Sequence, residues 1–178
     1  MWIEPDFTKS NQQEYQEYIY EITRQLGEAN FIRNTNRELM LVGKKGFTCP
    51  AVTRWCYLKN TYVVPRFDER NPELVKLIED FVNTYFPEIP YNTFTINKNA
   101  EMMPHKDRKN KDHSFIIGLG DYQGGELMID KLGVDREEDA VYEPYNIKER
   151  PLVFDGANHY HKVLPFTGDR YTIVAYYV

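Results

Sequence analysis

Apolar residues recur at helical spacing in two stretches of the first half of the chain. Ser10–Gln13 has the pattern S-x-x-Q, a capping box that predicts a helix start. The apolar face that follows it consists of Tyr15, Tyr18, Ile19, Ile22 and Leu26, and we expect Gly27 to end the helix. Pro72 predicts a second helix that ends before Phe86-Pro87. Residues 30–66 are weakly patterned, with short strands expected around 40–42 and 62–64.

After Pro90 the period changes from helix to strand. Alternating or apolar runs predict strands at residues 94–97, 115–119, 126–129, 152–154, 160–163 and 171–176. Tyr122–Gly125 is expected to form a turn, and the acidic stretch 130–150 a surface loop. Many short strands with glycine turns are typical of a sandwich or jelly roll. The sequence therefore predicts a mainly β protein with flanking helices.

The length of 178 residues fits one domain with a single core. We expect a helical N-terminal part, residues 1–90, packed on a jelly-roll core, residues 91–178. The aromatic content of 15% also favours strands, because Tyr and Phe suit half-buried pleated surfaces.

Charge and cysteine content exclude several classes of protein. The net charge of −5 excludes a protein that coats nucleic acid through global charge alone, although it allows a local basic site. Cys49 and Cys56 are too few for a disulfide scaffold, and their spacing fits no zinc or thioredoxin motif. The chain has no signal peptide and no long apolar run, so we expect a soluble intracellular protein with no membrane partner.

Histidine is scarce, and its positions suggest a metal site. His105-Lys106-Asp107 is an H-x-D pair, whose side chains share one face if the segment is a strand. His161 follows in a later strand, and Arg170 lies nine residues beyond it. Two histidines and one carboxylate with open positions are typical of non-haem Fe(II) oxygenases. Arg170 suits a dicarboxylate cosubstrate, and Thr172 shares its strand face.

Other interpretations of these residues remain open at this point. His159 competes with His161 as the third ligand, although the register of the following segment favours His161. His159 would then hydrogen-bond to a ligand. His113 lies among polar residues and is expected in a loop. Arg170 could instead form a structural ion pair.

Several motifs appear together in one order along the chain. They are Asn97-Lys98-Asn99, Pro104–Asp107, Gly118–Leu127, Phe154-Asp155-Gly156 and His161–Thr172. With them the sequence resembles the 2-oxoglutarate- and Fe(II)-dependent dioxygenases, and more narrowly the small TET/JBP-like oxygenase domains of algae, fungi and viruses. The resemblance is strongest over residues 92–178. One departure is Thr95, where the family often has glutamine.

The resemblance implies a double-stranded β-helix and an oxidoreductase. It makes His105, Asp107 and His161 the iron ligands, and it assigns the distal carboxylate of 2-oxoglutarate to Arg170 with Thr172. The implied cofactors are Fe(II), 2-oxoglutarate and O2, with ascorbate supporting activity. The implied reaction is hydroxylation of a C–H bond, with the methyl group of 5-methylcytosine or thymine in DNA as the substrate.

A basic run surrounds the predicted iron site. It consists of Lys106, Arg108, Lys109 and Lys111, with Lys44, Lys45 and Lys98 as possible neighbours. The run is either a solvated loop or a phosphate-binding surface, in which case Asn97 lies on the substrate side. A protein hydroxylase acting on prolyl or other side chains is the alternative enzyme. A non-catalytic jelly-roll module is the remaining alternative, although binding alone does not require all three ligands and the arginine.

Overall fold

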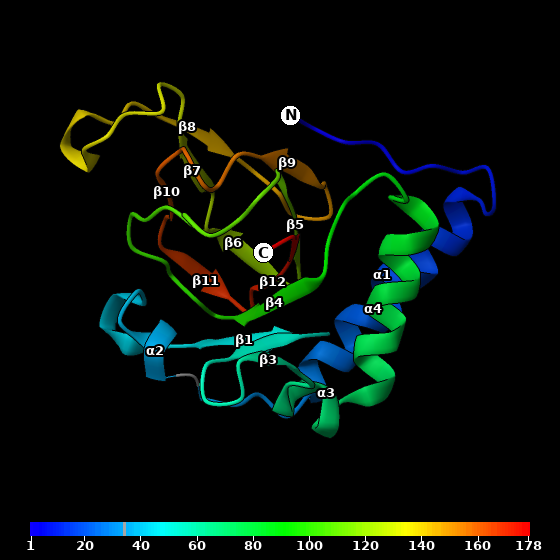
Figure 1. Cartoon of the computed structure of the whole chain (residues 1–178). Coiled ribbons are helices and arrows are strands. Elements are labelled where there is room, and N and C mark those ends of the chain that lie inside the picture. Colours follow the sequence, from blue (N-terminus) through cyan, green and yellow to red (C-terminus); the bar gives the residue numbers. More distant parts are fainter. Residues whose placement is uncertain (34) are drawn as a thin grey trace.

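The computed structural model describes residues 1–33 and 35–178, and its core is a pair of antiparallel sheets flanked by helices (Figure 1). The helices are α1 (Gln12–Glu28), α2 (Thr35–Glu38), α3 (Arg66–Arg70) and α4 (Pro72–Tyr85), with 3-10 turns η1 (Val42–Lys44) and η2 (Glu137–Asp139). The first strands are β1 (Phe47–Ala51), β2 (Arg54–Cys56), β3 (Thr61–Val63), β4 (Thr93–Lys98), β5 (Ser114–Leu119) and β6 (Tyr122–Gly124). The others are β7 (Leu127–Asp130), β8 (Tyr142–Tyr145), β9 (Leu152–Phe154), β10 (His161–Val163), β11 (Phe166–Gly168) and β12 (Tyr171–Tyr176).

The major sheet has the strand order β1-β4-β12-β5-β9 and is antiparallel throughout. Its central strand β12 places Thr172 opposite Asn97 of β4 on one side and Gly118 of β5 on the other. Successive side chains of a strand point to opposite faces. Phe94 and Ile96 therefore face the helices, whereas Thr95 and Asn97 of the same strand line a central pocket.

Helices α1 and α4 cover the outer face of the major sheet (Figure 1). Their apolar stripes pack against side chains of β4, β5 and β12 that are fully buried, among them Phe94, Phe115 and Ile173. The predicted helices are confirmed with two changes at α1. Asn11, not Ser10, caps it by accepting a hydrogen bond from the Glu14 amide, and the helix continues through Gly27 to Glu28.

The second sheet, with the order β10-β7-β8, faces the major sheet across the pocket, and the pair β11-β6 lies beside it. A second apolar cluster lies between the sheets, and its members Met102, Ile116, Leu127 and Phe154 line part of the pocket. The mainly β jelly roll predicted from the strand pattern is confirmed.

The strand boundaries differ from the sequence predictions in several places. Residues 47–51 form the edge strand β1, so the major sheet begins before residue 91 and the first 90 residues are not only helical. Residues 40–42 are not a strand, whereas 61–63 form β3. Residues 122–124 form β6 rather than a turn, and 142–145 form β8 within the predicted loop 130–150.

Asp130 explains why that loop has a fixed course despite its polar sequence. This carboxylate is fully buried and accepts hydrogen bonds from the amides of Leu132, Val134 and Val141. Elsewhere, no helix among the described residues has the length and apolar character required to cross a membrane.

Candidate metal centre and its pocket

His105, Asp107 and His161 meet at the inner end of the second sheet. Their potential ligand atoms all lie within 4.8 Å of one another. His161 begins β10, while His105 lies in a loop and forms a single β-bridge with it. The two backbones exchange hydrogen bonds of 3.0 Å, and the Asp107 amide donates to the Gly156 carbonyl at 2.8 Å. The predicted convergence of the three residues is found, but through a bridge and a loop rather than along one strand.

Hydrogen bonds from the outer ring nitrogens orient both imidazoles. Nδ1 of His105 donates to the Met103 carbonyl at 2.7 Å, and Nδ1 of His161 donates to the His159 carbonyl at 2.9 Å. A carbonyl can only accept, so each Nδ1 carries a proton and each Nε2 is the nitrogen that faces the cluster. Such contacts to outer nitrogens are the usual means of fixing a metal-binding histidine.

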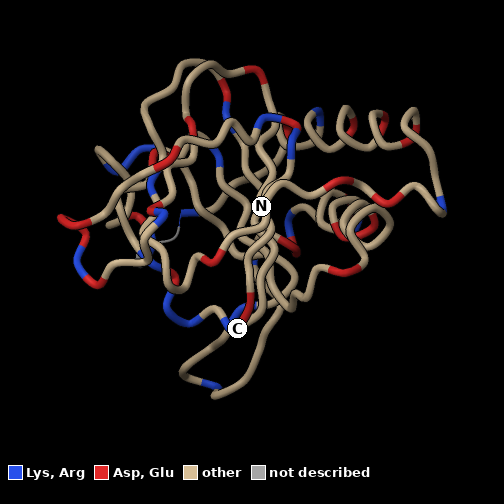
Figure 2. The backbone as a smooth tube through the Cα atoms, turned by 90° about the horizontal axis from the view of Figure 1, so that it is seen from above, with Lys and Arg blue, Asp and Glu red and all other residues tan. Residues whose placement is uncertain are grey.

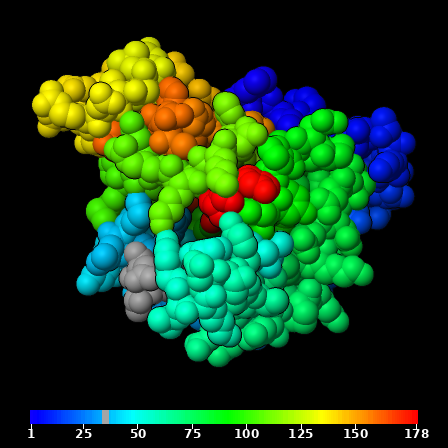
Figure 3. All heavy atoms as spheres, viewed as in Figure 1, coloured from blue at the N-terminus to red at the C-terminus, as the bar shows by residue number. Residues whose placement is uncertain are grey.

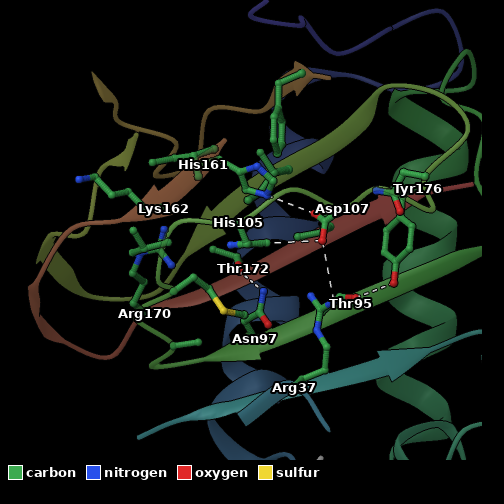
Figure 4. Close-up of a pocket in the computed structure, with 18 residues that line it drawn as sticks. Arg37, Thr95, Asn97, His105, Asp107, His161, Lys162, Arg170, Thr172 and Tyr176 are labelled. Atoms are coloured by element: carbon green, nitrogen blue, oxygen red, sulfur yellow. Dashed lines mark hydrogen bonds and ion pairs between the residues drawn. The ribbon is translucent and has the colours of Figure 1, made fainter. Parts of the chain in front are cut away.

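The three side chains aim at one small volume (Figure 4). Nε2 of His161 lies 3.1 Å from Oδ2 of Asp107, and Nε2 of His105 lies 3.8 Å from Oδ1. The first contact is a hydrogen bond, so two imidazole nitrogens face one carboxylate. With both rings neutral at Nε2, a cation between the three groups would take the place of that proton. The donor set therefore fits a divalent metal.

Protonation of the cluster also suits a metal. Burial, with the neighbouring His161, lowers the pKa of His105 to about 4, so its imidazole is neutral at pH 7. Burial acts to raise the pKa of Asp107, but the hydrogen bond and charge of His161, with His105 and Arg37, lower it to about 2. A neutral imidazole and an ionised carboxylate are the forms that bind metal.

Arg170 lies in the same pocket with its guanidinium buried. The side chain is 2% exposed, and its Nε and Nη2 have no hydrogen-bond partner. Its charge lies near the rings of Tyr122 and Phe166, with Cζ 5.5 and 5.8 Å from their centroids. Burial lowers the pKa of the guanidinium, an effect that Tyr122 opposes. The described residues give Arg170 no side-chain ion pair, so the structural ion-pair interpretation has no support.

Thr172 and Asn97 flank Arg170 on the pocket face of the major sheet. The Asn97 amide donates to the Thr172 hydroxyl at 2.9 Å, while Oδ1 of Asn97 is buried without a partner. Gly125 gives Arg170 the space it occupies, because a Cβ at this position would lie 2.8 Å from Nε. Its φ of +67° also favours glycine. The structure thus places Thr172 on the pocket face with Arg170, as the strand alternation predicted, and it adds Asn97 through the hydrogen bond to Thr172.

The remaining histidines lie outside the cluster. Nδ1 of His159 donates to the Asp130 carbonyl at 2.7 Å, and the ring packs beside Gly133. His159 does contact a cluster residue, through its carbonyl rather than its imidazole. His113 is exposed beside Asp112, as expected of a loop residue.

The residues of the basic run differ in their contacts: two lysines donate hydrogen bonds, and the other two residues are exposed. Lys106 donates to the Val134 carbonyl at 2.7 Å, and Lys109 donates to the Tyr57 hydroxyl at 2.5 Å. Arg108 and Lys111 are exposed. Lys45 and Lys98 line a different surface groove, none of whose lining residues lines the central pocket.

Several pocket residues were not predicted from the sequence. The wall away from Arg170 carries Arg37, Thr95 and Tyr176 (Figure 4), and Asn110 also lines the pocket. Nη1 of Arg37 lies 3.8 Å from Oδ1 of Asp107, and the Thr95 and Tyr176 hydroxyls are hydrogen-bonded at 2.9 Å. Alternation along β12 could have identified Tyr176, because Thr172, Val174 and Tyr176 share one face. Arg37 and Asn110 lie on short segments with no periodic signal.

Comparison with known proteins adds the fold. No protein-family model matches the sequence, and no curated protein matches it. The structure of NgTET1 in complex with 5mC DNA is similar over 94% of this chain and 68% of that chain, with TM-score 0.53 and 13% identity. A Burkholderia pseudomallei oxidoreductase of the 2OG-Fe(II) oxygenase family is similar over 97% and 81%, with TM-score 0.51 and 14% identity.

A third similar structure is a Trichoplax adhaerens prolyl hydroxylase in complex with a hypoxia inducible factor peptide fragment. The similarity extends over 98% of this chain and 82% of that chain, with TM-score 0.52 and 10% identity. The chain therefore has the double-stranded β-helix fold of the 2-oxoglutarate/Fe(II) oxygenases, with a His-Asp-His cluster inside it.

Proposed function

We propose that the protein is a 2-oxoglutarate- and Fe(II)-dependent dioxygenase that hydroxylates a methyl group of 5-methylcytosine or thymine in DNA. The observation that carries the chemistry is the guanidinium of Arg170, whose Nε and Nη2 are buried without a hydrogen-bond partner in the pocket that holds His105, Asp107 and His161. A buried, unpaired charge is costly unless a ligand completes it. A dicarboxylate with one end near the three-residue cluster and the other at Arg170 is such a ligand.

The chain's residues have separate roles in this reaction. His105, Asp107 and His161 would hold Fe(II), which with three protein ligands could also bind the cosubstrate and dioxygen. Arg170 binds the distal carboxylate of 2-oxoglutarate, and the Thr172 hydroxyl donates to the same group. The bound iron would supply oxygen activation: one oxygen atom enters the substrate as a hydroxyl group, and the other enters succinate as 2-oxoglutarate loses CO2. The apolar wall formed by Ile116, Leu127 and Phe154 limits water in the pocket.

Support for a DNA substrate comes from the mouth of the pocket. Arg108, Lys109 and Lys111 lie on either side of Asn110, which lines the pocket, in a chain whose net charge is −5. Positive charge at this point suits a phosphate backbone that presents one base to the pocket. The similarity to NgTET1 agrees with this substrate, whereas the similarity to a prolyl hydroxylase makes a protein substrate the second candidate.

Product analysis tests the proposal directly. The protein is incubated with Fe(II), 2-oxoglutarate and ascorbate, together with methylated DNA or a pool of proline-containing peptides, and the products are analysed by mass spectrometry. We expect the pyrimidine to gain one oxygen atom in step with succinate formation, and no product with Asp107→Ala. Hydroxylated peptide without oxidised base would overturn the DNA substrate and leave the dioxygenase chemistry in place.

Salt dependence tests the basic run independently of turnover. Changing Arg108, Lys109 and Lys111 to glutamine should flatten the plot of log affinity for DNA against log salt by up to about 0.9 per lost phosphate contact. Lys44→Gln with Lys45→Gln is the matched control, because Lys45 lines the separate groove. An equal slope for both variants would contradict phosphate binding by the run.

A further inference from the structure

The hairpin β2–β3 carries an unusual concentration of exposed aromatic side chains. Trp55 is 37% exposed, Tyr57 73% and Tyr62 43%, and none of them belongs to either apolar core cluster. Their rings contact one another, with centroids 5.1 Å apart for Trp55–Tyr62 and 6.4 Å for Trp55–Tyr57. Grouped exposed aromatic rings mark an interaction site more often than isolated ones do.

The hairpin contacts the basic run and the C-terminal residues through two hydrogen bonds. Lys109 donates to the Tyr57 hydroxyl, and the Tyr62 hydroxyl donates to the Val178 carbonyl at 3.1 Å. Lys111 contacts the C-terminal segment as well. Its amide donates to the Tyr177 carbonyl at 2.9 Å, and its ammonium lies 5.8 Å from the Tyr177 ring centroid. We call Trp55, Tyr57, Tyr62, Tyr177, Lys109 and Lys111 the hairpin patch.

The hairpin patch borders the opening of the central pocket. Asn110, between Lys109 and Lys111, and Tyr176, next to Tyr177, both line that pocket. In Figure 3 the C-terminal residues (red) lie between the hairpin (turquoise) and the green segment above it. A ligand lying on the patch would therefore pass the opening through which a substrate group must enter.

The charge of the patch selects the kind of ligand. Residues 54–63 contain Arg54 and Lys59 and no acidic residue, although the whole chain is acidic. Figure 2 shows basic segments beside the C-terminus and on the projecting hairpin. Aromatic rings interleaved with lysines are the arrangement that binds single-stranded nucleic acid, with bases stacked on the rings and phosphates at the cations.

We propose that the hairpin patch binds the unpaired strand on either side of the target base, so that the enzyme takes single-stranded rather than duplex DNA. This inference rests on the proposed function for the identity of the base. An unpaired strand offers flanking bases for stacking, whereas a duplex keeps these bases paired and adds the cost of extruding the target.

The test measures binding without turnover. Fluorescence anisotropy is recorded with a labelled DNA of about 12 nucleotides that contains one 5-methylcytosine, as a single strand and as a duplex. We expect the single strand to bind more tightly. Trp55→Ala and Tyr57→Ala should each weaken its binding about 5- to 150-fold. Tyr20→Ala, which removes a tyrosine of α1 that is 71% exposed, should change nothing.

Conservative variants separate stacking from folding. Trp55→Phe and Tyr57→Phe keep an aromatic ring and should retain most of the affinity, and thermal unfolding verifies that every variant is folded. If folded Trp55→Ala and Tyr57→Ala proteins bind the strand as the wild type does, or if the duplex binds as tightly, the inference is overturned.

The outcome also distinguishes this inference from the proposed function. If the enzyme oxidises the base but the patch variants bind DNA as the wild type does, the role of the hairpin patch is refuted and the DNA dioxygenase function stands. If binding of the strand depends on the hairpin patch but no oxidised base is formed, the patch is supported and the proposed reaction is refuted. A peptide that is hydroxylated and needs Trp55, with no binding of the DNA strand, overturns the nucleic-acid ligand.

Discussion

The two faces of the major sheet come from the same strands and have opposite characters. On the helix side, Phe94, Ile96 and Ile173 are fully buried among apolar neighbours. On the pocket side, Thr95, Asn97 and Thr172 are also buried but polar, and one of their oxygens has no partner. One face stabilises the fold, and the other holds groups whose partners come with a ligand.

This difference indicates where stability and function can be separated. Strand alternation places residues of the two kinds next to each other, so neighbouring substitutions in β4 or β12 should have unlike effects. A substitution in the core should lower the free energy of unfolding. A substitution in the pocket should instead weaken ligand binding and leave the free energy of unfolding nearly unchanged.

Loss of the metal is the largest expected effect. Asp107→Ala leaves two imidazoles and no charged ligand, so binding of Mn(II), used as an air-stable substitute for Fe(II), should become undetectable by calorimetry. His159→Ala is the matched control and should keep the metal, because the His159 ring lies beside Gly133 outside the cluster. Metal bound by Asp107→Ala but lost in His159→Ala would contradict the assignment of the site.

The two faces of β4 should differ next. Ile96→Ala removes a fully buried side chain and should lower the free energy of unfolding by about 2–5 kcal/mol. Thr95→Ala, one residue away, removes one hydrogen bond to the Tyr176 hydroxyl and should cost about 1 kcal/mol. Urea denaturation of both variants measures this contrast, and equal losses would show that the pocket face also carries the fold.

Local patterns made much of this arrangement predictable. The helices followed from apolar spacing, and the pocket face followed from alternation, which placed Thr172 beside Arg170. Strand β1 was not predicted, because Pro50 and a weak alternation hide a strand whose partner β4 lies far along the chain. Proline is tolerated there because β1 is an edge strand.

The site was predicted less completely than the fold. The H-x-D pair and His161 could be recognised because they are rare residues in fixed order. Arg37 could not, since its place beside Asp107 is set by tertiary packing of the short helix α2. The hairpin patch escaped prediction for a similar reason: its residues come together from the hairpin, the basic run and the C-terminus.

Substitution of Arg170 should change cosubstrate affinity and protein stability in opposite directions. Arg170→Leu removes the bidentate partner that we propose for the distal carboxylate, so affinity for 2-oxoglutarate should fall by about 2–4 kcal/mol, roughly 30- to 1000-fold. Without cosubstrate the variant should be as stable as the wild type or more so, because a buried guanidinium with unpaired nitrogens is replaced by an apolar side chain. Calorimetry and thermal unfolding with and without 2-oxoglutarate measure both effects. Retained cosubstrate affinity would place the dicarboxylate elsewhere.

Thr172 should give the smallest effect, and it distinguishes charge from hydrogen bonding at the carboxylate site that we propose beside Arg170. Thr172→Val keeps the shape of the side chain but removes a neutral donor, so 2-oxoglutarate affinity should fall by about 1 kcal/mol, roughly fivefold. The same change leaves the Asn97 amide without its acceptor in the free protein, so unfolding should also become slightly easier. If the hydroxyl contacts the cosubstrate, Thr172→Val should remain less stable than the wild type even at saturating 2-oxoglutarate. The reason is that the variant's complex with 2-oxoglutarate also lacks a hydrogen-bond donor. A stability loss without any change in cosubstrate affinity would assign Thr172 to the sheet alone, and Arg170 would then hold the carboxylate without it.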